Sequence, residues 1–380
     1  MTNLEEQRNR IDAIDEQIVK LFRERMDAAA EVARYKKEHG VKVLSQERER
    51  DVVYHAADAV GEELEEYVKS FYNVLLDLSR DYQREKIDIP SPFVDSVRKA
   101  LEETPGFFPH KATVACQGVE GAYSQQACDK LFSIPKIFYF KNFEGVCQAV
   151  DSGMCRYGIL PIENSSAGSV NAVYDLTRKY NFHIVRCLKL KVEHNLLAKS
   201  GVKLSDIREI VSHEQALLQC GEFLKKHPEI KATVCENTAV AARIVANSER
   251  NDIAAIASGS CAEIYGLSSL SERIQNSDHN YTRFICISKN LEIYPDGDKI
   301  TFTTTLSHRP GALYNLISRF ASLGLNVCKI ESRPILGKDF EFRFYFDVEG
   351  TLRSEPTLKM LAQLESEGGF EFLGAYREQL

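Results

Sequence analysis

Pro161-Ile162-Glu163-Asn164-Ser165-Ser166 follows an apolar run, Tyr157 to Pro161, and precedes Gly168 and a stretch with helical spacing. The apolar run predicts a buried strand, so the hexapeptide places polar side chains and free amides at the carboxyl end of a strand. Ligands of α/β sheets bind at such ends. Taken alone, the motif also fits a capped loop in which a serine or asparagine begins the next helix. The rest of the sequence must therefore distinguish a site from a loop.

Strands and helices alternate around this motif. Apolar strands are predicted at Ala112 to Cys116, Ile253 to Ala257 and Phe284 to Ser288, and helices at Glu214 to Lys226 and Ala239 to Ala246. This alternation is typical of α/β proteins. We therefore expect residues 112–290 to form an α/β domain, with two lobes.

Further polar segments lie at the junctions between these elements. Gly118-Val119-Glu120-Gly121-Ala122-Tyr123-Ser124 opens a helix, as anion-binding loops do, but it lacks the full dinucleotide fingerprint. Helix capping alone would explain the segments Ser212-His213-Glu214-Gln215, Gln219-Cys220 and Glu236-Asn237-Thr238. Thr282-Arg283-Phe284 follows Asn280 and, taken alone, is the start of an ordinary strand.

Residues 1–88 are predicted to form an all-helical module. Residues 3 to 86 contain no proline and two glycines, Gly40 and Gly61, which divide the stretch into a long helix and two further helical segments. Steps of three and four residues along the first helix give one seam: Leu4, Arg8, Ile11, Asp15, Ile18, Phe22, Arg25, Ala29, Val32 and Lys36. A cation in an apolar seam is costly without a partner. Either Asp15 and the edge of the seam satisfy the three cations, or the seam encloses an anion site.

The spacing of the cations favours a dimer. At 1.5 Å per residue, Arg8 lies roughly 25 Å from Arg25, too far for both to touch one small ligand from one straight helix. Three helices, one of them very long, also offer too little surface to bury the seam within one chain. We expect an entwined homodimer or a higher homo-oligomer.

Two further regions complete the chain. Residues 89–111 are predicted to be a linker, because prolines and Gly106 surround one short charged helix, Val94 to Glu103. Residues 298–380 are predicted to form an α+β domain with the βαββαβ order of the ferredoxin-like fold. Its elements are expected at Lys299 to Leu306, Gly311 to Leu323, Asn326 to Ser332, Phe340 to Val348, Pro356 to Ser366 and Phe370 to Gly374.

Composition narrows the class of function. The net charge is −7, which argues against a broad nucleic-acid surface but leaves room for a local basic pocket. No apolar run approaches the length of a membrane span, and the start of the chain is charged, so we expect a cytoplasmic protein. The ten cysteines are scattered without metal spacing. We expect no disulfide, no metal and no cofactor.

The helical module resembles the all-helical chorismate mutases over residues 4–86. The resemblance rests on Arg8, Arg25, Lys36, Arg48, Glu49, Ser79 and Gln83. It implies that these residues bind chorismate, that the cations hold its two carboxylates, and that Lys36 and Gln83 donate hydrogen bonds to the ether oxygen of the breaking bond. A pericyclic rearrangement needs such charge complementarity and no nucleophile. Ser45 departs from the family, where some relatives have an aspartate.

Residues 112–289 resemble prephenate dehydratases, on the pairing of Pro161-Ile162-Glu163-Asn164 with Thr282-Arg283-Phe284. The resemblance implies that Thr282 is the main catalytic residue, near the cleft between two lobes. We expect its hydroxyl to be an oriented donor that assists departure of hydroxide. The candidates to hold prephenate are Asn164, Ser165, Gln215, Arg283 and Phe284. Val119 and Ala122 depart from the usual glycine loop of the family.

Residues 299–376 resemble the ACT regulatory domain of phenylalanine biosynthesis. The resemblance rests on His308-Arg309-Pro310-Gly311-Ala312-Leu313 and Glu331-Ser332-Arg333-Pro334, and implies that phenylalanine binds through these motifs at a dimer interface and inhibits the enzyme. A tight turn before a helix would explain the first motif as well.

The three resemblances together predict a bifunctional enzyme that converts chorismate to prephenate and prephenate to phenylpyruvate, under feedback control by phenylalanine. Two alternatives stay open. An arogenate dehydratase shares these motifs and differs by one amino group on its substrate. A non-catalytic amino-acid sensor would combine a two-lobed α/β domain with an ACT domain, although Thr282 and the cations of the seam count against it.

Overall fold

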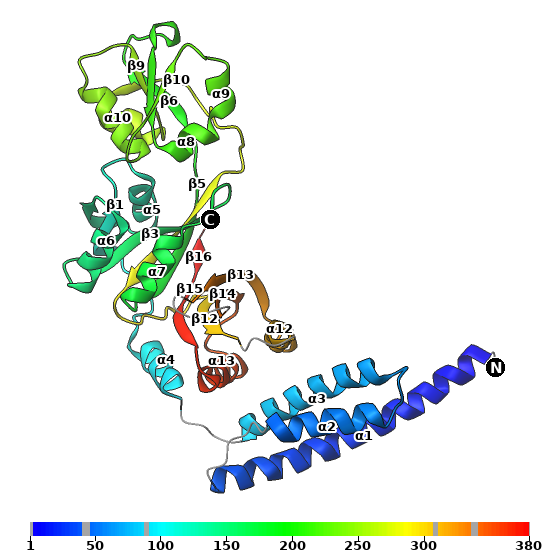
Figure 1. The fold of residues 1–380 in the computed structure, drawn as a ribbon. Helices are drawn as coiled ribbons and strands as arrows, with labels where there is room; N and C mark the ends of the chain where they lie inside the picture. Colours follow the sequence, from blue (N-terminus) through cyan, green and yellow to red (C-terminus); the bar gives the residue numbers. More distant parts are fainter. Residues whose placement is uncertain (1–2, 40–45, 87–90, 307–310, 336–340, 380) are drawn as a thin grey trace.

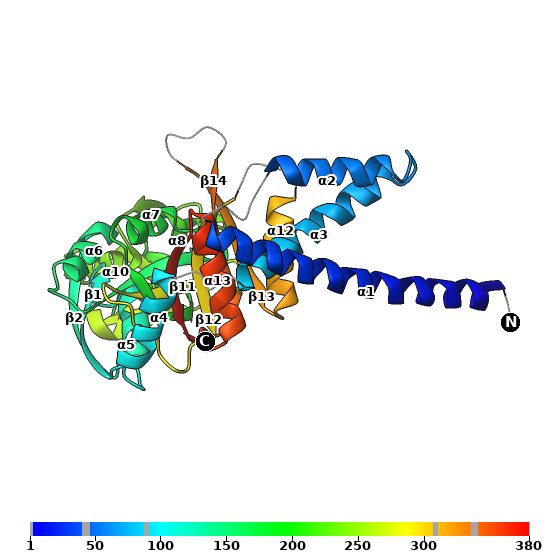
Figure 2. The same cartoon turned by 90° about the horizontal axis from the view of Figure 1, so that it is seen from below.

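The computed structural model describes residues 3–39, 46–86, 91–306, 311–335 and 341–379. The amino-terminal part is an arm of three helices: α1 (Asn3–Glu38), α2 (Gln46–Asp58) and α3 (Glu65–Lys86). Acidic residues in the first turn of α1 and lysines in its last turn complement the helix dipole. The amino-terminal end of α1 projects beyond α2 and α3 (Figures 1 and 2). The predicted long helix followed by two further helices is confirmed.

Helix α4 (Pro92–Glu103) joins the arm to the α/β part. Pro92 begins it, and Ser91 caps it by accepting a hydrogen bond from the Val94 amide. Phe93, Val97 and Ala100 are buried in the same apolar cluster as the carboxyl-terminal domain. The helix predicted within the linker therefore begins two residues earlier than expected and packs on the domain.

The first lobe contains a seven-stranded sheet in the order β16-β5-β11-β3-β1-β2, with β4 paired to β3. Its strands are β1 (Lys111–Gln117), β2 (Ile134–Phe140), β3 (Tyr157–Asn164), β4 (Gly168–Ser169), β5 (His183–Lys191), β11 (Tyr281–Ser288) and β16 (Glu378–Gln379). Helices α5 (Tyr123–Leu131), α6 (Phe143–Asp151) and α7 (Asn171–Lys179) accompany it. Separate apolar clusters cover the two faces, one around Ile285 and one around Phe284.

The second lobe contains a five-stranded sheet in the order β10-β6-β9-β7-β8. Its strands are β6 (Asn195–Lys199), β7 (Glu209–Ser212), β8 (Lys231–Val234), β9 (Ile253–Ala257) and β10 (Leu267–Ser271), with α8 (Glu214–Gln219), α9 (Gly221–Lys225), α10 (Thr238–Asn247) and α11 (Ser260–Tyr265). The chain enters this lobe after β5 and returns into β11 (Figure 1). The predicted two-lobed α/β arrangement is confirmed.

The helical stretch predicted at Glu214 to Lys226 is present, but it is divided into two helices. The helix ends at Gln219 and a new one begins at Gly221. The backbone amide of Glu222 donates to Asn276 Oδ1 at 3.0 Å. This amide is therefore not available for the hydrogen bond that would continue α8.

The carboxyl-terminal domain has the predicted order of elements: β12 (Lys299–Thr305), α12 (Ala312–Ser322), β13 (Asn326–Pro334), β14 (Phe342–Glu349), α13 (Glu355–Glu367) and β15 (Glu371–Tyr376). Its sheet runs β13-β14-β12-β15, and all neighbours are antiparallel. Phe302, Phe320 and Phe346 form its centre. The final strand, β16, leaves this sheet and pairs with β5 of the first lobe, which the sequence did not predict.

The helical arm contacts the carboxyl-terminal domain through α3 and α12. Asn315 donates to Asp77, and Arg319 lies 3.0 Å from Asp81. Figure 1 shows the arm extending away from the two lobes, with α12 beside α3. Among the described residues, no helix is long and apolar enough to cross a membrane.

Candidate active sites

Thr282 and Asn164 face each other where β11 pairs with β3. Asn164 Nδ2 donates to Thr282 Oγ1 at 2.9 Å, and Asn164 Oδ1 accepts from the amides of Ser166 and Ala167 at 3.0 and 2.9 Å. The two amides fix which way the Asn164 carboxamide points, because an oxygen must face them. Thr282 Oγ1 is therefore an acceptor here, and its own hydrogen is left to donate elsewhere.

The hydrogen bonds continue from this pair into the second lobe. Asn164 also donates to Asn280 Oδ1 at 2.9 Å, and Asn280 Nδ2 donates to Gln219 Oε1 at 3.0 Å. Gln219 Oε1 lies 2.9 Å from Nε2 of His194, whose burial lowers the pKa of the imidazole and keeps it neutral. The chain of amides thus spans the junction of the two lobes. Asn280 and His194 are both buried.

Gln219, rather than the predicted Gln215, belongs to this cluster. His213 caps α8 by accepting a hydrogen bond on Nδ1 from the backbone amide of Gln215 at 3.2 Å, so Gln215 lies in the first turn of α8, whereas Gln219 is its last residue. The two glutamines are four residues apart, so a helical pattern cannot separate them. The break in the helix after Gln219 is the feature that turns this end toward the junction.

Ser165 secures the backbone beside the pair. Its hydroxyl donates to the His279 carbonyl and accepts from the Tyr281 amide, each at 2.9 Å, and the Ser165 amide donates to the Tyr281 carbonyl at 2.8 Å. The structure thus brings together Thr282, Asn164 and Ser165 of the predicted residues. Ser165 is exposed.

Arg283 and Phe284 do not join this cluster. Arg283 is buried on the opposite face of β11 from Thr282, since adjacent strand residues alternate. Its guanidinium pairs with Asp347, donates to the Tyr376 hydroxyl at 2.9 Å and lies 2.8 Å from Glu378 Oε1. Phe284 is buried in the apolar core. Both side chains therefore have partners within the protein, and the substrate contacts predicted for them stay predictions.

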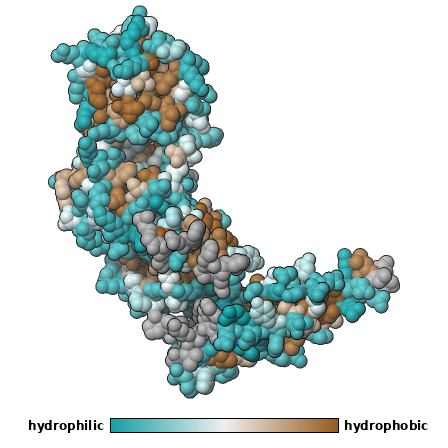
Figure 3. Space-filling view, in the orientation of Figure 1, coloured by the Kyte–Doolittle hydropathy of each residue, from teal (hydrophilic) through white to brown (hydrophobic). Residues whose placement is uncertain are grey.

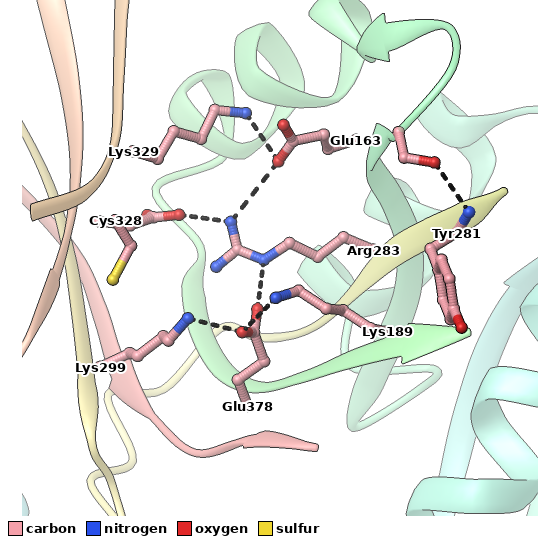
Figure 4. Close-up of a pocket in the computed structure, with 10 residues that line it drawn as sticks. Glu163, Lys189, Tyr281, Arg283, Lys299, Cys328, Lys329 and Glu378 are labelled. Atoms are coloured by element: carbon pink, nitrogen blue, oxygen red, sulfur yellow. Dashed lines mark hydrogen bonds and ion pairs between the residues drawn. The ribbon is translucent and has the colours of Figure 1, made fainter. Parts of the chain in front are cut away.

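Figure 4 shows the surroundings of Arg283, a cavity of about 270 Å³ between the first lobe and the carboxyl-terminal domain. Burial alone would raise the pKa of the Glu378 carboxyl, but hydrogen bonds from Lys299 and Lys189 and the charge of Arg283 outweigh it and lower this pKa to about 2. The carboxylate is thus ionised over the working pH range, and its charge is balanced by the surrounding cations.

The glycine loop is explained by packing between the lobes. Gly121 has φ +88°, and a Cβ there would lie 2.9 Å from Cys261 Sγ of the second lobe. Ala122 is buried and Val119 packs beside it in the core of that lobe. The two departures from the family pattern are thus apolar contacts across the junction.

The predicted chorismate residues lie along α1, α2 and α3. Ser79 is buried, Arg25, Lys36, Glu49 and Gln83 are partly buried, and Arg8 and Arg48 are exposed. Among the described residues, Nη1 of Arg25 and Oε1 of Gln83 are buried without a hydrogen-bond partner. Burial lowers the pKa of Lys36, and nearby Glu49 partly opposes this. A buried guanidinium nitrogen without a partner is what an anionic ligand would satisfy.

Arg80 is a further buried cation of the arm that the sequence reading missed. It pairs with Glu49 and with Asp77. Arg80 follows Ser79 on α3. The apolar seam that pointed to the other cations runs along α1, so it could not identify Arg80. Because Glu49 is on α2 and Arg80 is on α3, their ion pair holds the two helices together, which indicates a structural role for Arg80.

The motifs of the carboxyl-terminal domain lie on α12 and β13. Gly311 has φ +82° and caps α12, Ala312 begins the helix, and Leu313 packs on the core. Glu331 accepts from Ser169, and Arg333 donates to the Asn171 carbonyl at 2.9 Å. Ser332 and Pro334 are exposed on β13. Ser45, His308, Arg309 and Pro310 lie outside the described residues.

Within the parts of the chain that the structure describes, no group of His, Cys, Asp or Glu side chains could hold a metal ion.

Known proteins match the chain along nearly its whole length. The prephenate dehydratase family model matches residues 114–292, and the chorismate mutase type II model matches residues 7–84. A bifunctional chorismate mutase/prephenate dehydratase from Enterobacter agglomerans is 30% identical over 97% of this chain and 94% of its own. The chloroplastic arogenate dehydratase/prephenate dehydratase 2 of Arabidopsis thaliana is 37% identical over 70% of this chain and 73% of its own.

A solved structure agrees with these matches. Prephenate dehydratase from Arthrobacter aurescens, determined in complex with L-Phe, superposes with a TM-score of 0.63 and 30% identity over 70% of this chain and 89% of that one. The dehydratase match contains Thr282 and Asn164, and the mutase match contains the three cations of the seam. The chain therefore belongs to the family of bifunctional chorismate mutase/prephenate dehydratases.

Proposed function

We propose that the two reactions of this enzyme run at two separate sites, with prephenate passing from the helical arm to the junction of the two lobes. The dehydratase site is assigned to Thr282 and Asn164, and the mutase site to the cations of α1 with Glu49, Ser79 and Gln83. The observation that carries the dehydratase assignment is the fixed Asn164 carboxamide, which donates to Thr282 at 2.9 Å.

In the dehydratase reaction, prephenate loses its ring hydroxyl and its ring carboxylate, as water and carbon dioxide, and the ring becomes aromatic. The driving force is aromatisation, so the enzyme has to assist the leaving hydroxide and hold the substrate. A threonine hydroxyl is a poor acid. With its oxygen bound by Asn164, Thr282 would act as an oriented hydrogen-bond donor to the departing oxygen. Gln219 and Asn280 keep this pair in place across the lobes.

In the mutase reaction, the arm would hold both carboxylates of chorismate and stabilise the charge that develops on the ether oxygen. Arg25 is assigned to a carboxylate, because its Nη1 is buried without a partner among the described residues. Lys36 and Gln83 are assigned to the ether oxygen. Gln83 Nε2 now donates to Ser79 at 3.4 Å, and a half-turn of the amide would free this group for the ligand.

We further propose that the arm forms a homodimer in which Arg8 of one chain completes the site of the other. Along α1, Leu4, Ile11, Ile18 and Phe22 are exposed, as are Arg8 and much of α3. Figure 3 shows apolar residues interspersed along this arm. An exposed apolar stripe of this length is typical of a face that pairs with another helix.

Mixing two inactive variants tests the shared site. Arg8→Ala and Arg25→Ala chains, unfolded together and refolded, should recover about a quarter of the wild-type mutase activity, because half of the dimers are mixed and each has one intact site of two. Each variant alone, treated identically, should stay inactive. Absence of recovery, with dimers present by sedimentation, would show that each site uses one chain.

We propose that the carboxyl-terminal domain, residues 298–380, is an ACT domain of ferredoxin-like fold that binds phenylalanine. The other proposed regions are a mutase module at 1–88, a linker at 89–111 and a dehydratase domain at 112–290. The order of elements and the antiparallel sheet of the carboxyl-terminal domain support its assignment. The amides that begin α12 can receive a carboxylate, and Glu331 can receive an ammonium group. The related dehydratase from Arthrobacter aurescens holds L-Phe in its solved structure.

Purified protein given chorismate should accumulate phenylpyruvate, which absorbs in alkali at wavelengths where chorismate does not. We propose prephenate as the preferred substrate of the second site, since the bifunctional relative matches 97% of this chain and the arogenate/prephenate relative matches 70% of it. Turnover of arogenate should be the slower of the two when kcat/KM is compared. A faster rate with arogenate would reverse the assignment, and no product from chorismate would refute the two-site scheme.

A further inference from the structure

Glu331 on β13 is held by the first lobe of the dehydratase. The Ser169 hydroxyl donates to Glu331 Oε2, and Lys329 Nζ lies 3.2 Å from the same oxygen. Lys329 Nζ also lies 3.1 Å from Ser169 Oγ and 3.0 Å from Glu163 Oε2. Two residues of the carboxyl-terminal domain and two of the dehydratase thus form one polar cluster, of which Figure 4 shows Lys329 and Glu163.

The dehydratase members of this cluster are directly connected to the dehydratase site. Glu163 pairs with Ser169 in the β3–β4 register, and the next pair along the two strands is Asn164 with Gly168. On the other side of β3, Glu163 pairs with Arg283 and Asn164 with Thr282. A shift of Ser169 or Glu163 therefore acts on the strand that carries Asn164, one residue away.

An amino acid that binds at the Glu331 motif would compete for this carboxylate. Its ammonium group needs an anionic acceptor, and the charge-assisted bond it makes is stronger than the one a serine hydroxyl makes. The Glu331 side chain is 20% exposed, and its contacts with Ser169 and Lys329 both fall on Oε2. An ammonium group that binds both carboxylate oxygens needs Oε2 as well, so the Ser169 hydroxyl then loses this acceptor.

We propose that Glu331 is an exchangeable carboxylate. It is held by Ser169 and Lys329 in the unliganded enzyme and taken by the ammonium group of phenylalanine on binding, and its release shifts Glu163 and β4 and so disturbs the Asn164–Thr282 pair. This inference rests on the proposed phenylalanine site. Feedback inhibition would then be transmitted through two side-chain contacts, Glu331 with Ser169 and Lys329 with Glu163.

The route predicts opposite effects on binding and on inhibition. Breaking the bond between Ser169 and Glu331 costs free energy that phenylalanine must supply, and that cost is the coupling between the two sites. If the bond is absent beforehand, phenylalanine should bind more tightly and change the dehydratase less. A residue that only stabilised the fold would not separate these two quantities.

Ser169→Ala is the direct test. Equilibrium dialysis should show the Kd for phenylalanine falling by about tenfold, the scale of one hydrogen bond to a charged group. At saturating phenylalanine, the variant should retain a clearly larger fraction of its uninhibited dehydratase rate than wild type does. Ser152→Ala is the matched control, because this serine of the same lobe donates locally to the Ala149 carbonyl at 3.3 Å, away from β13.

Glu163→Gln tests the second contact. The glutamine carbonyl still accepts a hydrogen bond from Lys329, but the negative charge is gone. Maximal inhibition by phenylalanine, taken as a fraction of the variant's own uninhibited rate, should therefore be smaller. The Kd for phenylalanine should stay within about twofold of wild type. Unchanged or weaker binding together with full inhibition in Ser169→Ala would overturn the exchange. If wild type itself neither binds phenylalanine nor is inhibited by it, the proposed regulatory function fails instead.

Discussion

Replacing Thr282 by alanine is expected to lower the dehydratase kcat by roughly 10²–10⁴-fold, the range for loss of an oriented donor or acid, while prephenate formation continues at the wild-type rate. The methyl group of alanine cannot donate to the departing oxygen, and Asn164 loses the acceptor that lies 2.9 Å away. Single turnover with prephenate, read as phenylpyruvate, measures the loss. Chorismate consumption in the same sample measures the mutase.

Thr282→Ser is the matched control for this prediction. It keeps the hydroxyl and removes only a methyl group, so it should retain activity within about tenfold of wild type. An alanine variant as active as the serine variant would mean that the hydroxyl takes no part in the chemistry. Asn164→Ala should resemble Thr282→Ala in kcat, since it leaves the hydroxyl present but without its fixed orientation.

The converse result is expected for Arg25→Ala, which should lower the mutase kcat/KM by roughly 10²–10³-fold, because removing one partner of a buried ion pair costs about 2–5 kcal/mol. Dehydration of added prephenate should proceed at the wild-type rate. The side chain is partly buried and its Nη1 has no partner among the described residues, so its loss removes a ligand contact and breaks no bond within the protein that the structure shows.

Arg34→Ala controls for loss of a positive charge on the same helix. Arg34 is exposed and pairs with Glu31 at 3.0 Å, and its removal should leave both activities near wild type. If Thr282→Ala and Arg25→Ala each removed both activities from folded protein, separate active sites would be the wrong description.

The order of elements could be predicted from the sequence because it depends on local patterns. Two glycines divide the helical arm, and the order of apolar strands and helical stretches marks the carboxyl-terminal domain. Asn164 and Thr282 could be predicted as site residues because Asn164 lies at the end of one apolar strand and Thr282 near the start of another. Their pairing across β3 and β11, 118 residues apart, required the fold.

The sequence could not place residues whose surroundings are decided by tertiary contacts. Arg283 follows Thr282 directly, but the two lie on opposite faces of one strand, and the acidic partners of Arg283 come from residues 347 and 378. Gln215 and Gln219 are both on α8, and a helix break caused by Asn276 selects the second. Neither Asp347, Glu378 nor Asn276 is near these residues in the sequence.

The two residues of β16 have a consequence for how the protein is made. They are the last described residues of the chain, yet they form the edge of the dehydratase sheet beside β5. During synthesis, the amino-terminal arm can fold early, but this sheet cannot gain its edge strand until the carboxyl-terminal domain has left the ribosome. Glu378, which neutralises Arg283 next to Thr282, is made together with β16, after the carboxyl-terminal domain. The dehydratase is therefore completed only once the domain proposed to regulate it has been made.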